Sequence, residues 1–259
     1  MHPFTLIRPK SLAEAGNAFR GDAAFLAGGH TLIPAMKARL RAVETLIDLT
    51  AIPGLDGIAR EGDHLRIGAT ARHAKVARDA AVRQSIPALA TLAGGIGDPQ
   101  VRNRGTIGGS LANNDPAADW PAAALGLDAV LETSQGSHAA EDYFQGMFAT
   151  ALADGEILTA IRFRVPQAAA YAKHPHPASR YALAGLFVAR FPEGHRVAVT
   201  GATMGVMRWT GAEAALDTGE SLEGLSLASD DLASDIHASA EFRGHLAGVM
   251  LRKAASELV

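Results

Sequence analysis

A pair of adjacent glycines followed at a short distance by an aspartate constrains the fold of this sequence more than any other feature. The segment 102–122 reads RNRGTIGGSLANNDPAADWPA. Glycine tolerates a positive φ and the close approach of other atoms, so the backbone N–H groups of residues 106–110 can lie next to an anion. Asp119, ten residues after Gly109, can then bind a ribose hydroxyl group. The pattern predicts a phosphate-binding turn with a sugar contact beside it.

A second glycine turn lies upstream. Residues 25–34 read FLAGGHTLIP, so an apolar run leads into two glycines and then into a threonine hydroxyl. Neither turn has the Rossmann spacing G-x-G-x-x-G or the P-loop spacing that ends in G-K-S or G-K-T. Two phosphate turns in one chain therefore predict a dinucleotide that is held by neither of the two commonest nucleotide motifs.

Both turns lie inside longer motifs that identify a family. The segments AGGHTLIPAMK and IGDPQVRNRGTIGGSLANNDPAADWPAA closely resemble the FAD-binding medium subunit of molybdenum hydroxylases, in particular the aerobic carbon monoxide dehydrogenase type. The segment ASDIHASAEFRGHLAGVMLRKA near the end resembles the C-terminal domain of that subunit. The resemblance thus extends through nearly the whole chain.

The resemblance implies a fold of the α+β and α/β classes. It is a two-domain FAD-binding fold of the molybdenum hydroxylase flavoprotein (PCMH-like) type, followed by a C-terminal α+β domain. We expect an N-terminal FAD-binding subdomain over 1–53, a middle FAD-binding subdomain over 54–166 and a C-terminal flavoprotein domain over 167–259. Pro53-Gly54, a turn signal between two regular segments, marks the first boundary.

The resemblance also implies where FAD binds. The first glycine turn would wrap one side of the pyrophosphate and the second turn the other side, with Ile96-Gly97 near the flavin ring and Asp119 on the ribose. Lys173 and Tyr181 match the family's lysine and its ring-stacking tyrosine. The implied FAD contacts are Ala27, Gly28, Gly29, His30, Thr31, Leu32, Ile96, Gly97, Thr106, Gly108, Gly109, Ser110, Asp119, Lys173 and Tyr181.

Several of these residues have a structural alternative. His30 either contacts the ligand or is a polar residue tolerated in a turn. Asp119 either binds ribose or caps the helix that follows it. Tyr181 either stacks on the flavin, where its displacement could gate access, or buries its ring and pairs its hydroxyl group. His174 and His176 form an H-x-H that suggests a metal, but no third ligand is placed by spacing.

The composition excludes other functions. A formal net charge of −3 provides no basic surface for nucleic acid. The chain has no cysteine, so a cysteine-ligated iron–sulfur cluster must belong to another polypeptide. No basic and apolar leader opens the sequence, and no run approaches 18 apolar residues. We therefore expect a cytoplasmic protein that does not span a membrane.

The apolar patterns predict the elements. Ser11–Phe19 is expected as a helix with Ser11 as N-cap and Glu14 in a capping box. Residues 166–177 are expected as a connector, and 180–191, apolar at both parities, as a buried strand. Residues 238–258 predict a helix with one apolar stripe, formed by Phe242, Leu246, Val249, Met250 and Ala254. Further expected helices cover 32–39, 74–81, 85–93, 117–127 and 211–216, and further strands 23–26, 45–49, 65–68, 129–132, 157–165 and 196–204.

These observations predict an FAD-dependent oxidoreductase subunit of a heterotrimeric molybdenum hydroxylase. As the resemblance implies, the molybdenum cofactor lies on a large partner subunit and two 2Fe–2S clusters lie on a small one. FAD on this chain would pass the electrons to a quinone or to NAD. The alternatives are a stand-alone FAD-dependent oxidoreductase and a non-catalytic paralogue kept for assembly.

Overall fold

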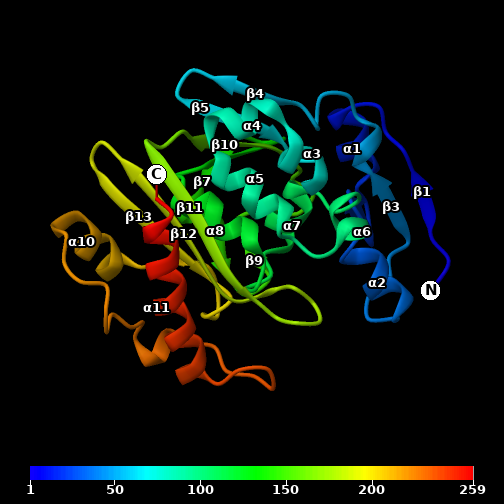
Figure 1. Cartoon of the computed structure of the whole chain (residues 1–259). Coiled ribbons are helices and arrows are strands. Elements are labelled where there is room, and N and C mark those ends of the chain that lie inside the picture. Colours follow the sequence, from blue (N-terminus) through cyan, green and yellow to red (C-terminus); the bar gives the residue numbers. More distant parts are fainter. Residues whose placement is uncertain (259) are drawn as a thin grey trace.

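Three β-sheets of three, five and four strands follow one another along the chain and form the body of the molecule (Figure 1). The structure is a computed structural model that describes residues 1–258. The three-stranded sheet lies at one end of the molecule, the five-stranded sheet in the middle and the four-stranded sheet at the other end. The chain thus contributes its early, middle and late segments to neighbouring layers.

The first sheet is parallel, in the order β1-β3-β2. Its elements are β1 (Thr5–Ile7), α1 (Leu12–Ala18), β2 (Ala23–Leu26), α2 (Leu32–Lys37) and β3 (Thr45–Asp48). Successive residues of β3 face two small cores, with Leu46 packed near Met36 and Ile47 near Ala15. The alternation of strand and helix therefore gives the predicted α/β arrangement.

Helix α1 begins where the sequence predicts. Ser11 is its N-cap, and the Ser11 hydroxyl accepts the N–H of Glu14 at 3.1 Å. The Glu14 carboxylate accepts the N–H of Lys10 at 2.7 Å, one residue earlier than in a standard capping box. The N-cap is confirmed, and the reciprocal bond reaches the preceding residue.

The middle sheet is antiparallel, in the order β4-β5-β10-β6-β7. Its strands are β4 (Ile58–Glu61), β5 (His64–Gly68), β6 (Val130–Thr133), β7 (Ser137–Ala139) and β10 (Leu158–Arg164). The helices of this part are α3 (His73–Arg78), α4 (Ala80–Ser85), α5 (Pro87–Gly94), α6 (Pro99–Arg102), α7 (Ile107–Asn113), α8 (Asp119–Gly126) and α9 (Ala140–Tyr143). The expected single helix over 74–81 is wrong, because Asp79 ends α3 and caps α4 by accepting the N–H groups of Ala81 and Val82.

The last sheet is antiparallel, in the order β11-β12-β13-β14. It comprises β11 (Ala168–Pro175), β12 (Ala182–Phe191), β13 (Gly194–Thr200) and β14 (Met207–Arg208). The connector expected over 166–177 is therefore wrong. Its alanines resemble a linker, yet their small side chains let β11 pair with β12 and lie against α11.

Strand β12 is buried on both faces, as its composition predicts. Leu186 and Val188 belong to a core shared with α11, whereas Phe187 and Ala189 belong to the large core under the middle sheet. Helix α8 packs on that second face. The last sheet therefore separates two cores, which explains why β12 is apolar at both parities.

Helix α11 (Ala240–Ser256) is the longest helix of the described residues. Leu246, Met250 and Ala254 are buried along its inner face, but Phe242 is 46% exposed, so the predicted stripe is one residue too long. Arg243 is buried beside this stripe. Its guanidinium donates to the carbonyls of Leu183 and Gly201 and to the Asp235 carboxylate.

The remaining elements are short: η1 (Leu49–Ala51), β8 (Phe144–Gly146), β9 (Ala149–Thr150), α10 (Thr210–Thr218) and η2 (Ser229–Asp231). Among residues 1–258, none of the helices has both the length and the apolar character needed to cross a bilayer.

Candidate functional site: a cavity between the first two sheets

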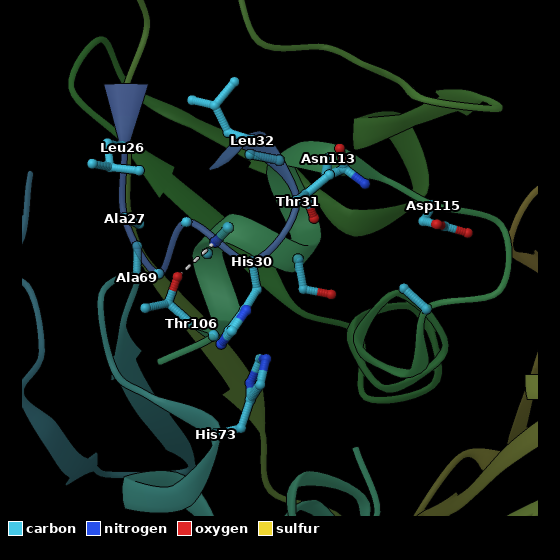
Figure 2. Close-up of a pocket in the computed structure, with 18 of the residues that line it drawn as sticks. Leu26, Ala27, His30, Thr31, Leu32, Ala69, His73, Thr106, Asn113 and Asp115 are labelled. Carbon is cyan, nitrogen blue, oxygen red and sulfur yellow. Dashed lines mark hydrogen bonds between the residues drawn. The ribbon is translucent and has the colours of Figure 1, made fainter. Parts of the chain in front are cut away.

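A cavity of about 680 Å³ lies where the turn after β2 meets the N-terminal end of α7 (Figure 2). The loop between β9 and β10 and the segment before β12 also line it. Every predicted FAD contact lines this cavity except Lys173. Segments that lie more than 150 residues apart in the sequence thus meet around one space.

The first glycine turn has the geometry that the sequence predicts. Gly29 has a φ of +74°, which favours glycine. A Cβ on Gly28 would lie 2.3 Å from the carbonyl oxygen of Arg104, so a side chain there would collide with backbone. Within the described residues, none of the N–H groups of residues 28–32 donates a hydrogen bond to the protein. Five donors in a row are therefore free for a ligand.

The second glycine pair differs from the prediction. Residues 107–110 form the first turn of α7, and neither Gly108 nor Gly109 has a positive φ. The N–H of Gly108 donates to the carbonyl of Ala69 at 2.8 Å, and that of Gly109 to the hydroxyl of Thr106, the N-cap, at 3.2 Å. The expected cradle of free N–H groups is wrong here.

Close packing explains the glycine at position 108 instead. A Cβ on Gly108 would lie 2.5 Å from the Cβ of Ala69, the residue that follows β5. The absence of a side chain lets α7 approach the end of β5 and brings the side chains of Thr106 and Ser110 to the cavity wall.

Asp119 is a buried carboxylate at the start of α8, with 5% of its surface exposed. The N-cap of α8 is Ala118, and no side chain caps the helix, so the alternative role of Asp119 as N-cap is wrong. Its carboxylate accepts the Tyr171 hydroxyl at 2.5 Å and lies 2.9 Å from Nζ of Lys173. Burial raises the pKa of Asp119, and the ammonium and hydroxyl groups beside it oppose that rise.

Lys173 connects the last sheet to this wall. Its side chain is 9% exposed, and Nζ also donates to the carbonyls of Gly95 and Arg180, both at 3.1 Å. The lysine therefore lies behind Asp119 and ties together the two segments that flank the cavity mouth.

Tyr181, which directly precedes β12, lines the cavity with 44% of its surface exposed. The alternative in which Tyr181 buries its ring is wrong, because the buried tyrosine of this region is Tyr171. Arg180, the residue before Tyr181, has a φ of +63°. The backbone thus turns sharply before β12 and presents the Tyr181 ring at the cavity mouth.

His30 donates to or accepts from no side chain in the described residues, but its Nε2 lies 3.2 Å from the carbonyl oxygen of Gln100. His176 has a local role, because Nδ1 accepts the N–H groups of Ala178 and Ser179. Its ring packs edge-on against His237 with centroids 4.6 Å apart. Turn geometry and ring packing thus explain His176.

Some of the lining residues could not be recognised from sequence. Thr70 lies between β5 and α3, and His73 begins α3; Leu152 lies in the loop before β10, and Leu158 begins that strand. These residues carry no motif, and they reach the cavity only because the strands β5 and β10 pair.

The sequence and structure match one family over most of the chain. The family described as "FAD binding domain in molybdopterin dehydrogenase" matches residues 2–168. The chain belongs to this family. The carbon monoxide dehydrogenase medium chain of Afipia carboxidovorans is 38% identical over 97% of this chain and 95% of its own length. The nicotine 6-hydroxylase medium subunit of Paenarthrobacter nicotinovorans is 34% identical over 90% of this chain and 88% of its own length.

The solved structures agree. A crystal structure of Cu,Mo-CO dehydrogenase superimposes with a TM-score of 0.88 at 36% identity and covers 99% of this chain and 98% of the matched chain. The predicted family and fold class are therefore confirmed. This protein is an FAD-binding medium subunit of the molybdenum hydroxylase type and an FAD-dependent oxidoreductase subunit.

The cavity fits FAD by its own chemistry. Its volume lies in the range of roughly 300–1,000 Å³ that is typical of cofactor sites. Five unpaired N–H donors on the first turn suit a pyrophosphate, and one buried carboxylate on the opposite wall suits hydroxyl groups. The residues present therefore fit the cofactor that the family binds.

Proposed function

We propose that this chain carries FAD as the electron-transfer subunit of a heterotrimeric molybdenum hydroxylase. The observation that carries the proposal is a cavity that combines free phosphate donors with a half-exposed tyrosine at its mouth, in a chain without cysteine. Bound FAD supplies redox chemistry that exchanges electrons one or two at a time, and the protein binds and orients it. Its partners would be a small subunit with 2Fe–2S clusters and a large subunit with the molybdenum cofactor.

We propose the following roles for the cavity residues. The N–H groups of Gly28 to Leu32 bind the pyrophosphate, and the side chains of Thr106 and Ser110 hold its other side. Asp119 accepts a ribose hydroxyl group, and Lys173, 2.9 Å away, opposes the rise in the pKa of that carboxyl group and holds it in place. Ile96 and Gly97 support the flavin ring.

Tyr181 would cover the ring from the cavity mouth. A tyrosine that is 44% exposed on a sharply turned segment can move its ring aside without unpacking a core. Its displacement would open the flavin to the final acceptor, a quinone or NAD, in the cytoplasm. The role of Tyr181 is thus access to the flavin rather than acid–base chemistry.

The test is co-expression of the tagged chain with the reading frames beside its gene. We expect a cluster-bearing small subunit and a molybdenum-bearing large subunit to co-purify, and the substrate of the large subunit to bleach the flavin absorbance near 450 nm. A matched sample that lacks the small subunit should leave the flavin oxidised. Rapid substrate turnover by this chain alone would favour the stand-alone oxidoreductase, and a chain that assembles without FAD would favour the assembly paralogue.

A further inference from the structure

His73 is a buried histidine beside the cavity that none of the roles above uses. It is the first residue of α3, its N–H donates to the carbonyl of Gly105 at 3.0 Å, and 4% of its surface is exposed. Its Nδ1 lies 3.1 Å from Nε1 of Trp120, which is fully buried in the first turn of α8. One hydrogen bond from the backbone N–H of His73 and one to its ring nitrogen Nδ1 thus fix the position of the imidazole.

The contact with Trp120 fixes the tautomer of His73. An indole N–H can only donate a hydrogen bond, so Nδ1 of His73 must be the acceptor. The ring proton of the neutral imidazole then lies on Nε2. Burial, assisted by the nearby charges of His30 and Arg102, lowers the pKa of His73 to about 4. The ring is therefore a neutral Nε2–H donor at physiological pH.

This donor faces the cavity and has no acceptor in the described part of the chain. A Cβ on Gly105 would lie 2.8 Å from Nε2, so glycine at this position leaves the donor uncovered. Gly105 and His73 both line the cavity, and Figure 2 shows the His73 ring directed toward His30. Nε2 is not among the buried unpaired atoms of the described residues, so it is open to the cavity, where an acceptor atom of a ligand can reach it.

We propose that Nε2–H of His73 donates a hydrogen bond to an acceptor atom of bound FAD, with Trp120 as the positioning residue that fixes the donor tautomer. The proposal rests on FAD as the cofactor but not on the partner subunits. The Gly28 turn, which carries the free N–H groups, packs directly on Gly105, so the donor and those groups lie on the same side of the cavity. His73 would add a directed side-chain contact to a turn that otherwise offers backbone donors.

Two amide variants test the roles of the two ring nitrogen atoms of His73 separately. A glutamine amide can place an N–H near the position of Nε2, whereas an asparagine amide can place an oxygen near Nδ1. His73→Asn therefore keeps an acceptor for Trp120 and loses the cavity donor. His73→Gln keeps a cavity donor and loses the acceptor for Trp120.

The experiment titrates the full-length apoprotein with FAD and follows the flavin fluorescence. We expect His73→Asn to raise the Kd of FAD about tenfold, the loss of one hydrogen bond, and His73→Gln to raise it by about threefold or less. Circular dichroism and thermal midpoints verify that both variants fold. Equal Kd values for the Asn variant and the wild type would overturn the proposal.

NMR of the wild type, labelled with ¹⁵N at histidine, keeps the test independent of the variants. We expect the His73 ring as the Nε2–H tautomer in the apoprotein, with a downfield shift of that proton when FAD binds. An Nδ1–H tautomer, or an Nε2–H resonance that FAD leaves unchanged, would overturn the proposal. A chain that passes both tests yet recruits no partner subunit would contradict the proposed electron-transfer function and leave this inference standing.

Discussion

The buried imidazole of His73 should make the stability of the apoprotein depend on pH. Its pKa is about 4 in the folded protein and about 6.5 in an unfolded chain. Between these values the unfolded state binds a proton that the native state excludes, so the free energy of unfolding falls as the pH falls from 6.5 to 4. From the two pKa values, this one group removes about 2 kcal/mol between pH 7 and pH 5.

The magnitude can be measured against the variant His73→Asn, which has no titrating ring. Urea unfolding of both apoproteins, followed by tryptophan fluorescence at pH 7 and pH 5, gives two changes in the free energy of unfolding. The wild type should lose about 2 kcal/mol more than the variant. His30 and Arg102, the charged groups that face the ring, are present in both proteins, so the comparison isolates the ring of His73. Equal losses in the two proteins would show that His73 is solvated, and the argument for a fixed donor would fail.

Four further substitutions test other parts of the molecule. Gly28→Ala should abolish measurable FAD binding because its Cβ would meet a backbone carbonyl at 2.3 Å, whereas the matched control Gly16→Ala, with no atom within 4 Å, should bind normally in the same titration. Asp119→Asn should raise the Kd of FAD by one to two orders of magnitude, the loss of a charge-assisted bond of about 1.5–3 kcal/mol, and an unchanged Kd would remove its ribose role. Tyr181→Ala should retain FAD but change its absorbance spectrum and its reoxidation rate, and unchanged values would make the tyrosine structural. Arg243→Met should lower the free energy of unfolding by about 3 kcal/mol, because the carbonyls of Leu183 and Gly201 lose the buried guanidinium that donates to them. It should leave the Kd of FAD unchanged, because none of these three residues lines the cavity.

The sequence predicted those parts of the fold whose signal is local. Ser11 caps α1 because a hydroxyl residue at the first turn satisfies a free N–H wherever the helix packs. The burial of 182–191 followed from apolar residues at both parities. The prediction of a connector over 166–177 was wrong for the opposite reason. The alanines of this segment have little preference for a strand of their own, and residues 168–175 form one only by pairing with β12.

The site shows the same division. The glycine turn at Gly28 was predictable because two adjacent glycines are typical of a turn that needs a positive φ and close approach of other atoms, and both requirements are local. The role of Gly108 was not, since it depends on Ala69, which lies 39 residues earlier and comes near only when β5 and α7 pack. Tyr171 and Trp120 are ordinary core aromatic residues in the sequence. Their contacts with Asp119 and His73 exist only in the folded chain.

Helix α8 connects these contacts. Its first two residues, Asp119 and Trp120, face different neighbours because successive side chains on a helix diverge by about 100°. Asp119 meets Lys173 from the last sheet, whereas Trp120 meets the ring of His73 from α3. One helix terminus thus fixes a carboxylate on one side of the cavity and a neutral donor on the other. A shift of α8 would displace both groups together, so the packing of the last sheet on α8 bears directly on how well the cavity holds FAD.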